Sequence, residues 1–208
     1  LITQHFEIQP ELREELEKRE KTALLEKLSH SDIESGKIQI TMQQRALGLG
    51  HAVWCAKNLV GDEPFAVVLV DVRTLGEAGC MAQMMEAYNQ FGGNVIASSP
   101  VPEDLTYKYG ILDVEDDGAD VSKIKAMVEK PKPEEAPSNL HILGRYILQP
   151  EIFSILEERK VGAGGEIQLT DAMERLMKTQ SFTSVKLKGE TYDCGHHLGF
   201  IEANIAFA

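Results

Sequence analysis

The hydrophobic residues in the first part of the chain alternate between helical and strand spacing. Leucines recur about every four residues between Pro10 and Leu28, with charged residues between them, and predict a helix. Residues 38–42, IQITM, alternate apolar and polar side chains and predict a strand. Helical spacing returns over residues 48–59. The continuous apolar run FAVVLV at residues 65–70 is typical of a parallel strand buried on both faces.

The rest of the chain continues this alternation. Residues 81–91 have helical spacing, and residues 94–98 predict a strand. Beyond Pro100 the apolar runs are short and are separated by Asp, Gly and Pro. The strands predicted there are YGILDV, IKAMVEKP, LHILGRYIL and FTSVKL, and the predicted helices cover residues 150–158, 170–179 and 198–207. Strands that alternate with helices predict an α/β fold with a parallel sheet.

Composition narrows the class of protein. The chain has 208 residues, 43% of them hydrophobic and 26% charged, so we expect one globular domain over residues 1–208. A net charge of −12 argues against a nucleic-acid partner, because an acidic surface repels phosphate backbones. No apolar run approaches the roughly 20 residues of a membrane span, and no signal peptide is visible. With three widely spaced cysteines that fit free thiols, we expect a cytoplasmic protein with no membrane partner.

Asp71 directly follows the apolar run at residues 65–70. If that run is a buried strand, the carboxylate lies just beyond its carboxyl end, where open α/β sheets bind ligands. Such a carboxylate suits Mg²⁺, a hard cation that takes oxygen ligands and shares them with phosphates. The alternative is that Asp71 only begins a turn.

A short glycine turn, Gly48-Leu49-Gly50, separates a predicted strand from a predicted helix. Its amides could face an anion or a base, as at other helix N-termini. It has neither the Gly-Lys-Ser/Thr of a P-loop nor a full GxGxxG pattern, and the latter absence also disfavours a Rossmann dehydrogenase. Read alone, the turn is better explained as a plain connection.

Three further segments contain residues of interest. In VEKPK, Glu129 and Lys130 are neighbours on a strand, so we expect their side chains to point to opposite faces, one toward sugar hydroxyls and the other toward a phosphate. A solvated ion pair is the alternative. In TYDCGHHLGF, Asp193 could be a second ligand for a hard metal, whereas the spacing matches no common zinc site. In GEIQLTDA, Thr170 is a plausible helix N-cap.

The order of these motifs is more specific than any one of them. Gln43, GLGHAV, FAVVLVD, YGILD, VEKPK, SNLHILGRYIL, GAGGEIQLTDA and DCGHHLG follow one another along the chain. Together they resemble the bacterial UTP–glucose-1-phosphate uridylyltransferases (UDP-glucose pyrophosphorylases), from about Leu12 almost to the end. The longest matches are EKPKPEEAPSNL, GRYIL and GEIQLTDA, and the last is shared by sugar nucleotidyltransferases generally.

The resemblance implies a nucleotide-diphospho-sugar transferase fold, a Rossmann-like three-layer α/β/α sandwich with a mixed, mostly parallel sheet. Its nucleotide-binding half would cover about residues 1–99 and its sugar-binding half about residues 100–208. The implied reaction is in-line attack of glucose 1-phosphate on the α-phosphorus of UTP with Mg²⁺, giving UDP-glucose and pyrophosphate. A homo-dimer or tetramer is expected by resemblance only.

The resemblance also implies roles for nucleotide-binding residues. Gln43 and Gly48 would contact the uracil. Asp71 would bind Mg²⁺, and Asp193 matches a second metal ligand of related nucleotidyltransferases. Asp71 is thereby one of two predicted catalytic residues.

A second set of implied roles concerns the sugar phosphate. Gly110 and Gly144 would lie near the glucose, and Glu129 would bind its hydroxyls. Lys130 would bind the phosphate and is the other predicted catalytic residue.

The sequence departs from the family pattern near its start. The family's Gly-rich loop, of the type GxGTR followed by Pro-Lys, wraps the triphosphate and supplies a catalytic lysine, and LITQHFEIQP contains no counterpart. Met42 stands where an arginine is expected, and LVD at residues 69–71 where LPD is usual. Either these residues are part of a longer active enzyme, or the chain is complete and we predict essentially no turnover.

Two alternative functions stay open. The chain could be another sugar nucleotidyltransferase that uses dTTP or a different hexose phosphate, although GLGHAV and EKPKPEEAPSNL favour UTP and glucose. It could also be a non-catalytic protein that binds a nucleotide sugar, because the phosphate-binding loop has no counterpart.

Overall fold

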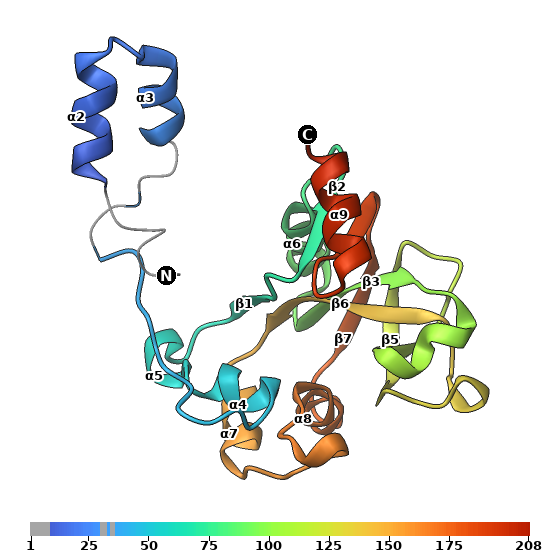
Figure 1. Ribbon diagram of the computed structural model, residues 1–208. Helices are drawn as coiled ribbons and strands as arrows, with labels where there is room; N and C mark the ends of the chain where they lie inside the picture. The colour runs from blue at the N-terminus through green and yellow to red at the C-terminus, as the bar shows by residue number, and fades with distance from the viewer. Residues whose placement is uncertain (1–8, 30–32, 34–35) are drawn as a thin grey trace. The chain divides into compact units, whose positions relative to one another are not determined.

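A computed structural model describes residues 9–29, 33 and 36–208 (Figure 1). The chain divides into two compact units between Thr41 and Met42. A division into two units was not expected from the sequence. The proposed assignment of nucleotide and sugar to residues 1–99 and 100–208 stays a prediction.

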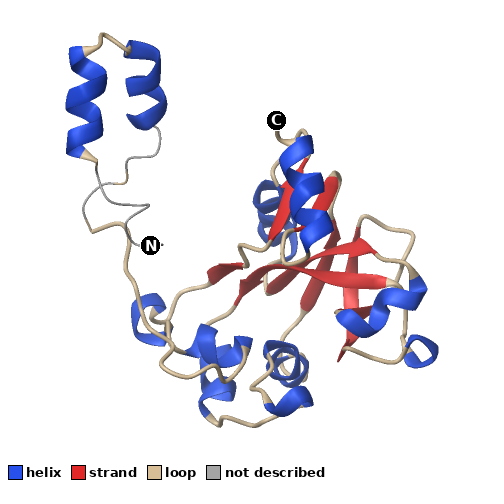
Figure 2. Ribbon diagram, in the orientation of Figure 1, coloured by secondary structure: helices blue, strands red, loops and turns tan. Residues whose placement is uncertain are grey.

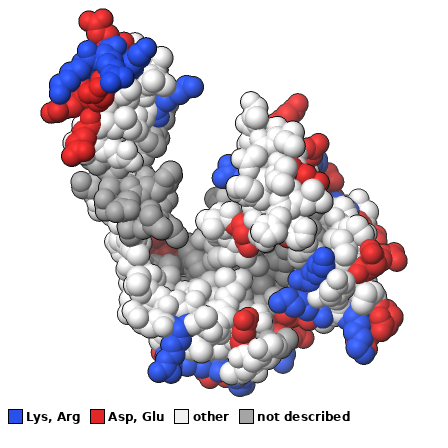
Figure 3. Space-filling model, viewed as in Figure 1, with Lys and Arg blue, Asp and Glu red and all other residues white. Residues whose placement is uncertain are grey.

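In its described residues, the first unit has two antiparallel helices, α2 (Pro10–Lys18) and α3 (Thr22–Ser29). The single helix predicted over residues 10–28 is therefore wrong, because the chain turns at Glu20, whose φ of +53° lies in the left-handed region. Pro10 begins α2 at a position where its missing N–H costs nothing. Figure 3 shows acidic and basic side chains intermixed over these helices, which fits a solvated surface.

The strand predicted at residues 38–42 is also wrong, because the structure assigns no strand there. Ile40 and Met42 are exposed, Met42 to 69%. Alternating side chains favour a strand only where a neighbouring strand and a buried face stabilise it.

The second unit is built on a described sheet in the order β1-β6-β3-β7-β5-β4. Its strands are β1 (Phe65–Val68), β3 (Asn94–Pro100), β4 (Gly110–Val114), β5 (Val121–Glu129), β6 (Leu140–Leu148) and β7 (Phe182–Lys186). The sheet is mixed as expected, but among the described pairings only β3 and β7 run parallel. A short connection joins only β4 to β5 among these antiparallel pairs, whereas β1–β6, β3–β6 and β5–β7 pair strands far apart in the chain. Hydrophobic patterns do not show such long-range pairings or their direction.

Strand β1 was expected to be buried on both faces, and this is wrong. It is an edge strand that pairs with β6 and alternates half-buried with exposed residues. Val70, just beyond it, is 87% exposed. A continuous apolar run therefore marks the strand correctly here but not its position in the sheet.

Helices cover both faces of the sheet, as Figure 2 shows. On β3, the side chain of Ile96 packs in one hydrophobic cluster with α7 and α8, and those of Val95 and Ala97 in another with α6. The described helices are α4 (Leu49–Trp54), α5 (Lys57–Val60), α6 (Cys80–Phe91), α7 (Ile152–Glu157), α8 (Leu169–Leu176) and α9 (His197–Ala206), with 3₁₀ turns η1 (Glu103–Lys108), η2 (Pro133–Glu135) and η3 (Ala163–Gly165). The predicted three-layer α/β/α arrangement is confirmed.

A small second sheet joins β2 (Val72–Leu75) to β8 (Glu190–Asp193) in antiparallel register. It places the chain after Asp71 beside the chain before α9. Within the described chain, every helix is too short or too polar to cross a membrane.

Candidate active site

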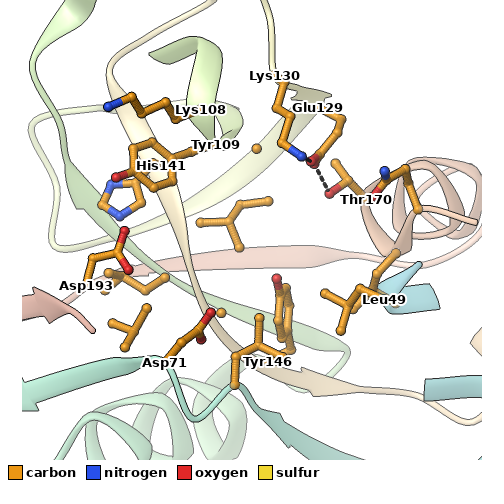
Figure 4. A pocket seen from close by; sticks show the side chains of 18 of the residues that line it. Leu49, Asp71, Lys108, Tyr109, Glu129, Lys130, His141, Tyr146, Thr170 and Asp193 are labelled. Atoms are coloured by element: carbon orange, nitrogen blue, oxygen red, sulfur yellow. Dashed lines mark hydrogen bonds and ion pairs between the residues drawn. The ribbon is translucent and has the colours of Figure 1, made fainter. Parts of the chain in front are cut away.

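A cavity of about 480 Å³ opens where the loop after β1 meets the ends of β4, β5 and β6 and the start of α8 (Figure 4). A cavity of this size suits a small-molecule ligand. Of the eight residues to which the sequence analysis gives a binding or catalytic role, six line the cavity: Asp71, Gly110, Glu129, Lys130, Gly144 and Asp193. The structure therefore brings together side chains separated by as many as 122 positions in the chain (193 − 71).

Two carboxylates, those of Asp71 and Asp193, lie on one side of this cavity. The register of the small sheet pairs Val72 with Asp193, and the Cys194 amide donates to the Asp71 carbonyl oxygen at 2.6 Å. A Cβ added to Gly195 would lie 3.1 Å from Asp193 Oδ1 and 4.0 Å from Asp71 Oδ2. One oxygen of each carboxylate thus lies within 4.0 Å of a common point beside Gly195.

This pair of carboxylates fits a divalent cation that is shared with phosphates. Mg²⁺ is commonly held by one or two carboxylates, with the remaining ligands from water and substrate phosphates. Among the described residues there is no cluster of three or more His, Cys, Asp or Glu side chains that could hold a metal ion. The donors favour a hard cation completed by its substrate over a closed structural site.

Opposite the two aspartates, Glu129 and Lys130 face the same cavity. Lys130 Nζ lies 3.5 Å from Glu129 Oε1. The expectation that the two side chains point to opposite faces is wrong, because β5 ends at Glu129 and Lys130 has a left-handed φ of +49°. The Lys130 amide donates to the Tyr109 carbonyl at 3.0 Å, which holds this turned conformation.

Thr170 has a different task from the one expected. The N-cap of α8 is Gln168, and the Thr170 hydroxyl instead donates to Glu129 Oε2 at 2.7 Å. Glu129 is thereby held between a hydroxyl and an ammonium, with its side chain only 13% exposed. The motif GEIQLTDA was visible in the sequence, but its contact with β5 was not.

Tyr109 and His141 also line the cavity and were not singled out from the sequence. Their rings lie 4.7 Å apart between centroids. Burial lowers the pKa of His141, and its Nδ1 lies 2.9 Å from the Ser99 carbonyl, so the ring is neutral at pH 7 and Nδ1 carries the proton. Burial, and then the charge of Asp193, raise the pKa of Tyr109.

Gly144 is required for the approach of another backbone segment. It has a φ of +66°, and a Cβ there would lie 2.9 Å from Leu69 Cδ1. The Leu69 amide donates to the Gly144 carbonyl at 2.9 Å. The segment that leads to Asp71 therefore still runs alongside β6 at this glycine, in continuation of the β1–β6 pairing.

Gln43 and Gly48 do not line the cavity, although Leu49 beside them does. Gln43 Nε2 donates to the Gly48 carbonyl at 3.1 Å and lies 3.0 Å from His51 Nδ1. The predicted contact of Gly48 with the uracil stays a prediction, and no space for a base lies where its side chain would be. A Cβ there would lie 2.7 Å from the Ile167 carbonyl oxygen, so this space is filled by backbone.

We compared the chain with known protein families. The model of the family described as nucleotidyl transferase matches residues 9–208. The chain belongs to the nucleotidyl transferase family.

Relatives within the nucleotidyl transferase family carry specific names. The chain is 45% identical to a UTP–glucose-1-phosphate uridylyltransferase of Bacillus subtilis (strain 168), covering 100% of this chain and 70% of the relative. It is 44% identical to that of Staphylococcus haemolyticus, covering 100% and 72%. Among solved structures, UDP-glucose pyrophosphorylase from Acinetobacter baumannii is similar with a TM-score of 0.87 at 35% identity, covering 99% of this chain and 72% of that one. A UDP-glucose pyrophosphorylase complexed with UDP-glucose has a TM-score of 0.85 at 34% identity, covering 99% and 75%.

The close packing around Gly48 in this nucleotidyl transferase predicts that a side chain at this position lowers the stability of the protein. We expect Gly48→Ala to destabilise the protein by about 3 kcal/mol, because a left-handed φ of +102° and a clash with Ile167 add together. Gly61→Ala is the matched control, since Gly61 has a φ of +71° but no atom within 4 Å of its Cβ position. It should cost about 1 kcal/mol in urea unfolding. Equal losses for the two variants would contradict the packing argument.

Proposed function

We propose that this chain makes UDP-glucose and pyrophosphate from UTP and glucose 1-phosphate. The observation that carries the proposal is that one cavity has the carboxylates of Asp71 and Asp193 on one side. On the other side it has the Lys130 ammonium beside the Glu129 carboxylate. The names of relatives at 42–45% identity support the same reaction. A nucleotide sugar carries both a diphosphate and a hexose. The side with the two aspartates suits the diphosphate with its metal ion, and the side with Glu129 and Lys130 suits the hexose and its phosphate.

The sugar phosphate lies at the Glu129–Lys130 side in this proposal. The Lys130 ammonium pairs with its phosphate, and Glu129 accepts hydrogen bonds from the hexose hydroxyls. The hydrogen bond from Thr170 fixes the Glu129 carboxylate, so less side-chain entropy is lost on binding. Gly110 and Gly144 line the same cavity and contact the glucose through their main-chain atoms.

The nucleotide lies between the two aspartates and the glycine turn. Asp71 and Asp193 hold Mg²⁺, and Gln43 and Gly48 contact the uracil. When bound there, Mg²⁺ neutralises charge on the triphosphate and on the departing pyrophosphate.

The chemical step needs positioning more than covalent help. A phosphate oxygen of glucose 1-phosphate attacks the α-phosphorus of UTP and forms the new P–O bond. The bond from the α-phosphorus to the α,β-bridging oxygen breaks in line, and pyrophosphate leaves with that electron pair. Lys130 holds the attacking phosphate at the correct angle and offsets the repulsion between the two anions.

Pyrophosphate release from UTP or dTTP with glucose 1-phosphate tests this function. We expect clear turnover with UTP and a lower kcat/KM with dTTP. A preference for dTTP would assign the chain to a different sugar nucleotidyltransferase. Binding of UDP-glucose with no pyrophosphate release would favour the non-catalytic alternative.

A further inference from the structure

Arg145 on β6 is a buried cation that the reaction described above does not use. It is only 8% exposed and does not line the cavity. Its Nη1 donates to the carbonyl oxygens of Leu69 and Gly144, and its Nη2 donates to the carbonyl oxygen of Val72. A buried guanidinium that is bound to main-chain oxygens requires an explanation, because burying a charge is costly.

Two of the oxygens bound by Arg145, those of Leu69 and Val72, lie on either side of Asp71 in the chain. Strand β1 ends at Val68 and β2 begins at Val72, so Asp71 lies in the short link between two different sheets. One planar guanidinium therefore holds both ends of this link.

The link is tied to Asp193 as well. The Asp71 carbonyl accepts from the Cys194 amide at 2.6 Å, and Val72 pairs with Asp193 across the small sheet. Fixing the Leu69 and Val72 carbonyls thus fixes where the Asp71 carboxylate stands relative to that of Asp193.

We propose that Arg145 is a positioning residue that sets the separation of the Asp71 and Asp193 carboxylates. It acts on the protein's two candidate metal ligands and touches neither substrate. Lysine is not equivalent to it, because a single ammonium lacks the planar pair of nitrogens that bind the two carbonyls in fixed directions. The inference rests on the proposed function for its kinetic consequence, but its structural part does not.

The test compares Arg145→Lys with the wild type and with Arg175→Lys. Arg175 forms an ion pair with Glu158 away from the two aspartates, so it controls for the exchange of arginine for lysine. In the protein without ligand, we expect faster hydrogen exchange at the amides of Leu69 and Cys194 and unchanged exchange at Ser122 on β5. The Mg²⁺ concentration for half-maximal rate should rise by about 10- to 100-fold, the range typical of residues that orient metal ligands. The KM for glucose 1-phosphate should not change.

A second variant covers the case in which Arg145→Lys does not fold. Val70→Gly adds backbone freedom in the same link at an exposed position, and we expect a smaller shift of the same kind. Mg²⁺ dependence and Cys194 exchange equal to those of the wild type in a folded variant would overturn the inference. So would faster exchange throughout the sheet with an unchanged Mg²⁺ requirement, since that indicates a merely structural role. A wild type without turnover contradicts the proposed function instead, and the exchange data still decide the role of Arg145.

Discussion

We expect Asp71→Asn to lower kcat/KM for pyrophosphate release by about 10²- to 10³-fold, the loss typical when one preorganised charge at the reacting group is removed. The side chain keeps its size, but the amide is a neutral and weaker oxygen ligand. Because the Cys194 amide binds the main chain of Asp71 and not its carboxylate, the loop should stay in place. The effect should therefore fall on catalysis and on the Mg²⁺ requirement, with little change in thermal stability.

Asp120→Asn is the control for this change. Asp120 is an exposed aspartate whose Oδ2 lies 2.8 Å from Lys188 Nζ. Such surface pairs contribute little, and we expect wild-type kinetics. If Asp71→Asn and Asp120→Asn both keep full activity, Asp71 does not hold the metal.

The second large effect is expected for Lys130→Met. We expect kcat/KM for glucose 1-phosphate to fall by about 10²-fold, because a charge-assisted contact to its phosphate is lost while the apolar stem remains. Lys130 Nζ is 3.5 Å from Glu129, so the variant also leaves that carboxylate without its neighbouring cation. The KM for UTP should change less, since the nucleotide is held at the other side.

Lys132→Met is the matched control two residues along the chain. Lys132 is exposed and lies 3.4 Å from Glu135 on η2. It should leave both substrate constants unchanged. A Lys130→Met variant that raises the KM for UTP and spares glucose 1-phosphate would reverse the assignment of the two sides.

Periodicity predicted most elements of the second unit. The patterns at residues 81–91, 94–98 and 198–207 correspond to α6, β3 and α9 within one or two residues. The burial of these elements differs: α6 buries one face, β3 is buried on both faces, and α9 buries only Gly199 and Ala203. Helical and strand spacing therefore identified the type of element but not how deeply it is buried. The errors at residues 10–28 and 38–42 fall where the structure buries few side chains, so the pattern had no packing to reflect.

The sequence analysis predicted the charged residues of the candidate site, but not the residues that hold them in position. Asp71, Glu129, Lys130 and Asp193 follow recognisable motifs, and the structure places them around one cavity. Arg145 and the other supports act through contacts that join positions far apart in the chain, such as the one from β6 to the Val72 carbonyl. Such contacts depend on the order of the strands in the sheet, which the sequence patterns did not predict.

Two glycines also make contacts with distant parts of the chain that the sequence did not predict. Gly48 was noticed as part of a turn, and its contact with Ile167 explains its φ of +102° in physical terms. Gly144 was assigned to the sugar through the family pattern, and its close approach to Leu69 adds a structural reason. Its contact with glucose stays a prediction, as do the homo-oligomer and the cytoplasmic location.

The fate of the two ends of the triphosphate tests the central claim most directly. Purified protein with glucose 1-phosphate and Mg²⁺ would be given UTP labelled with ³²P at either the α or the γ position. The account predicts that the α label is transferred to UDP-glucose and the γ label to pyrophosphate, at equal rates. If neither label leaves UTP while UDP-glucose still binds, the cavity is a binding site without the proposed transfer, and the account is contradicted.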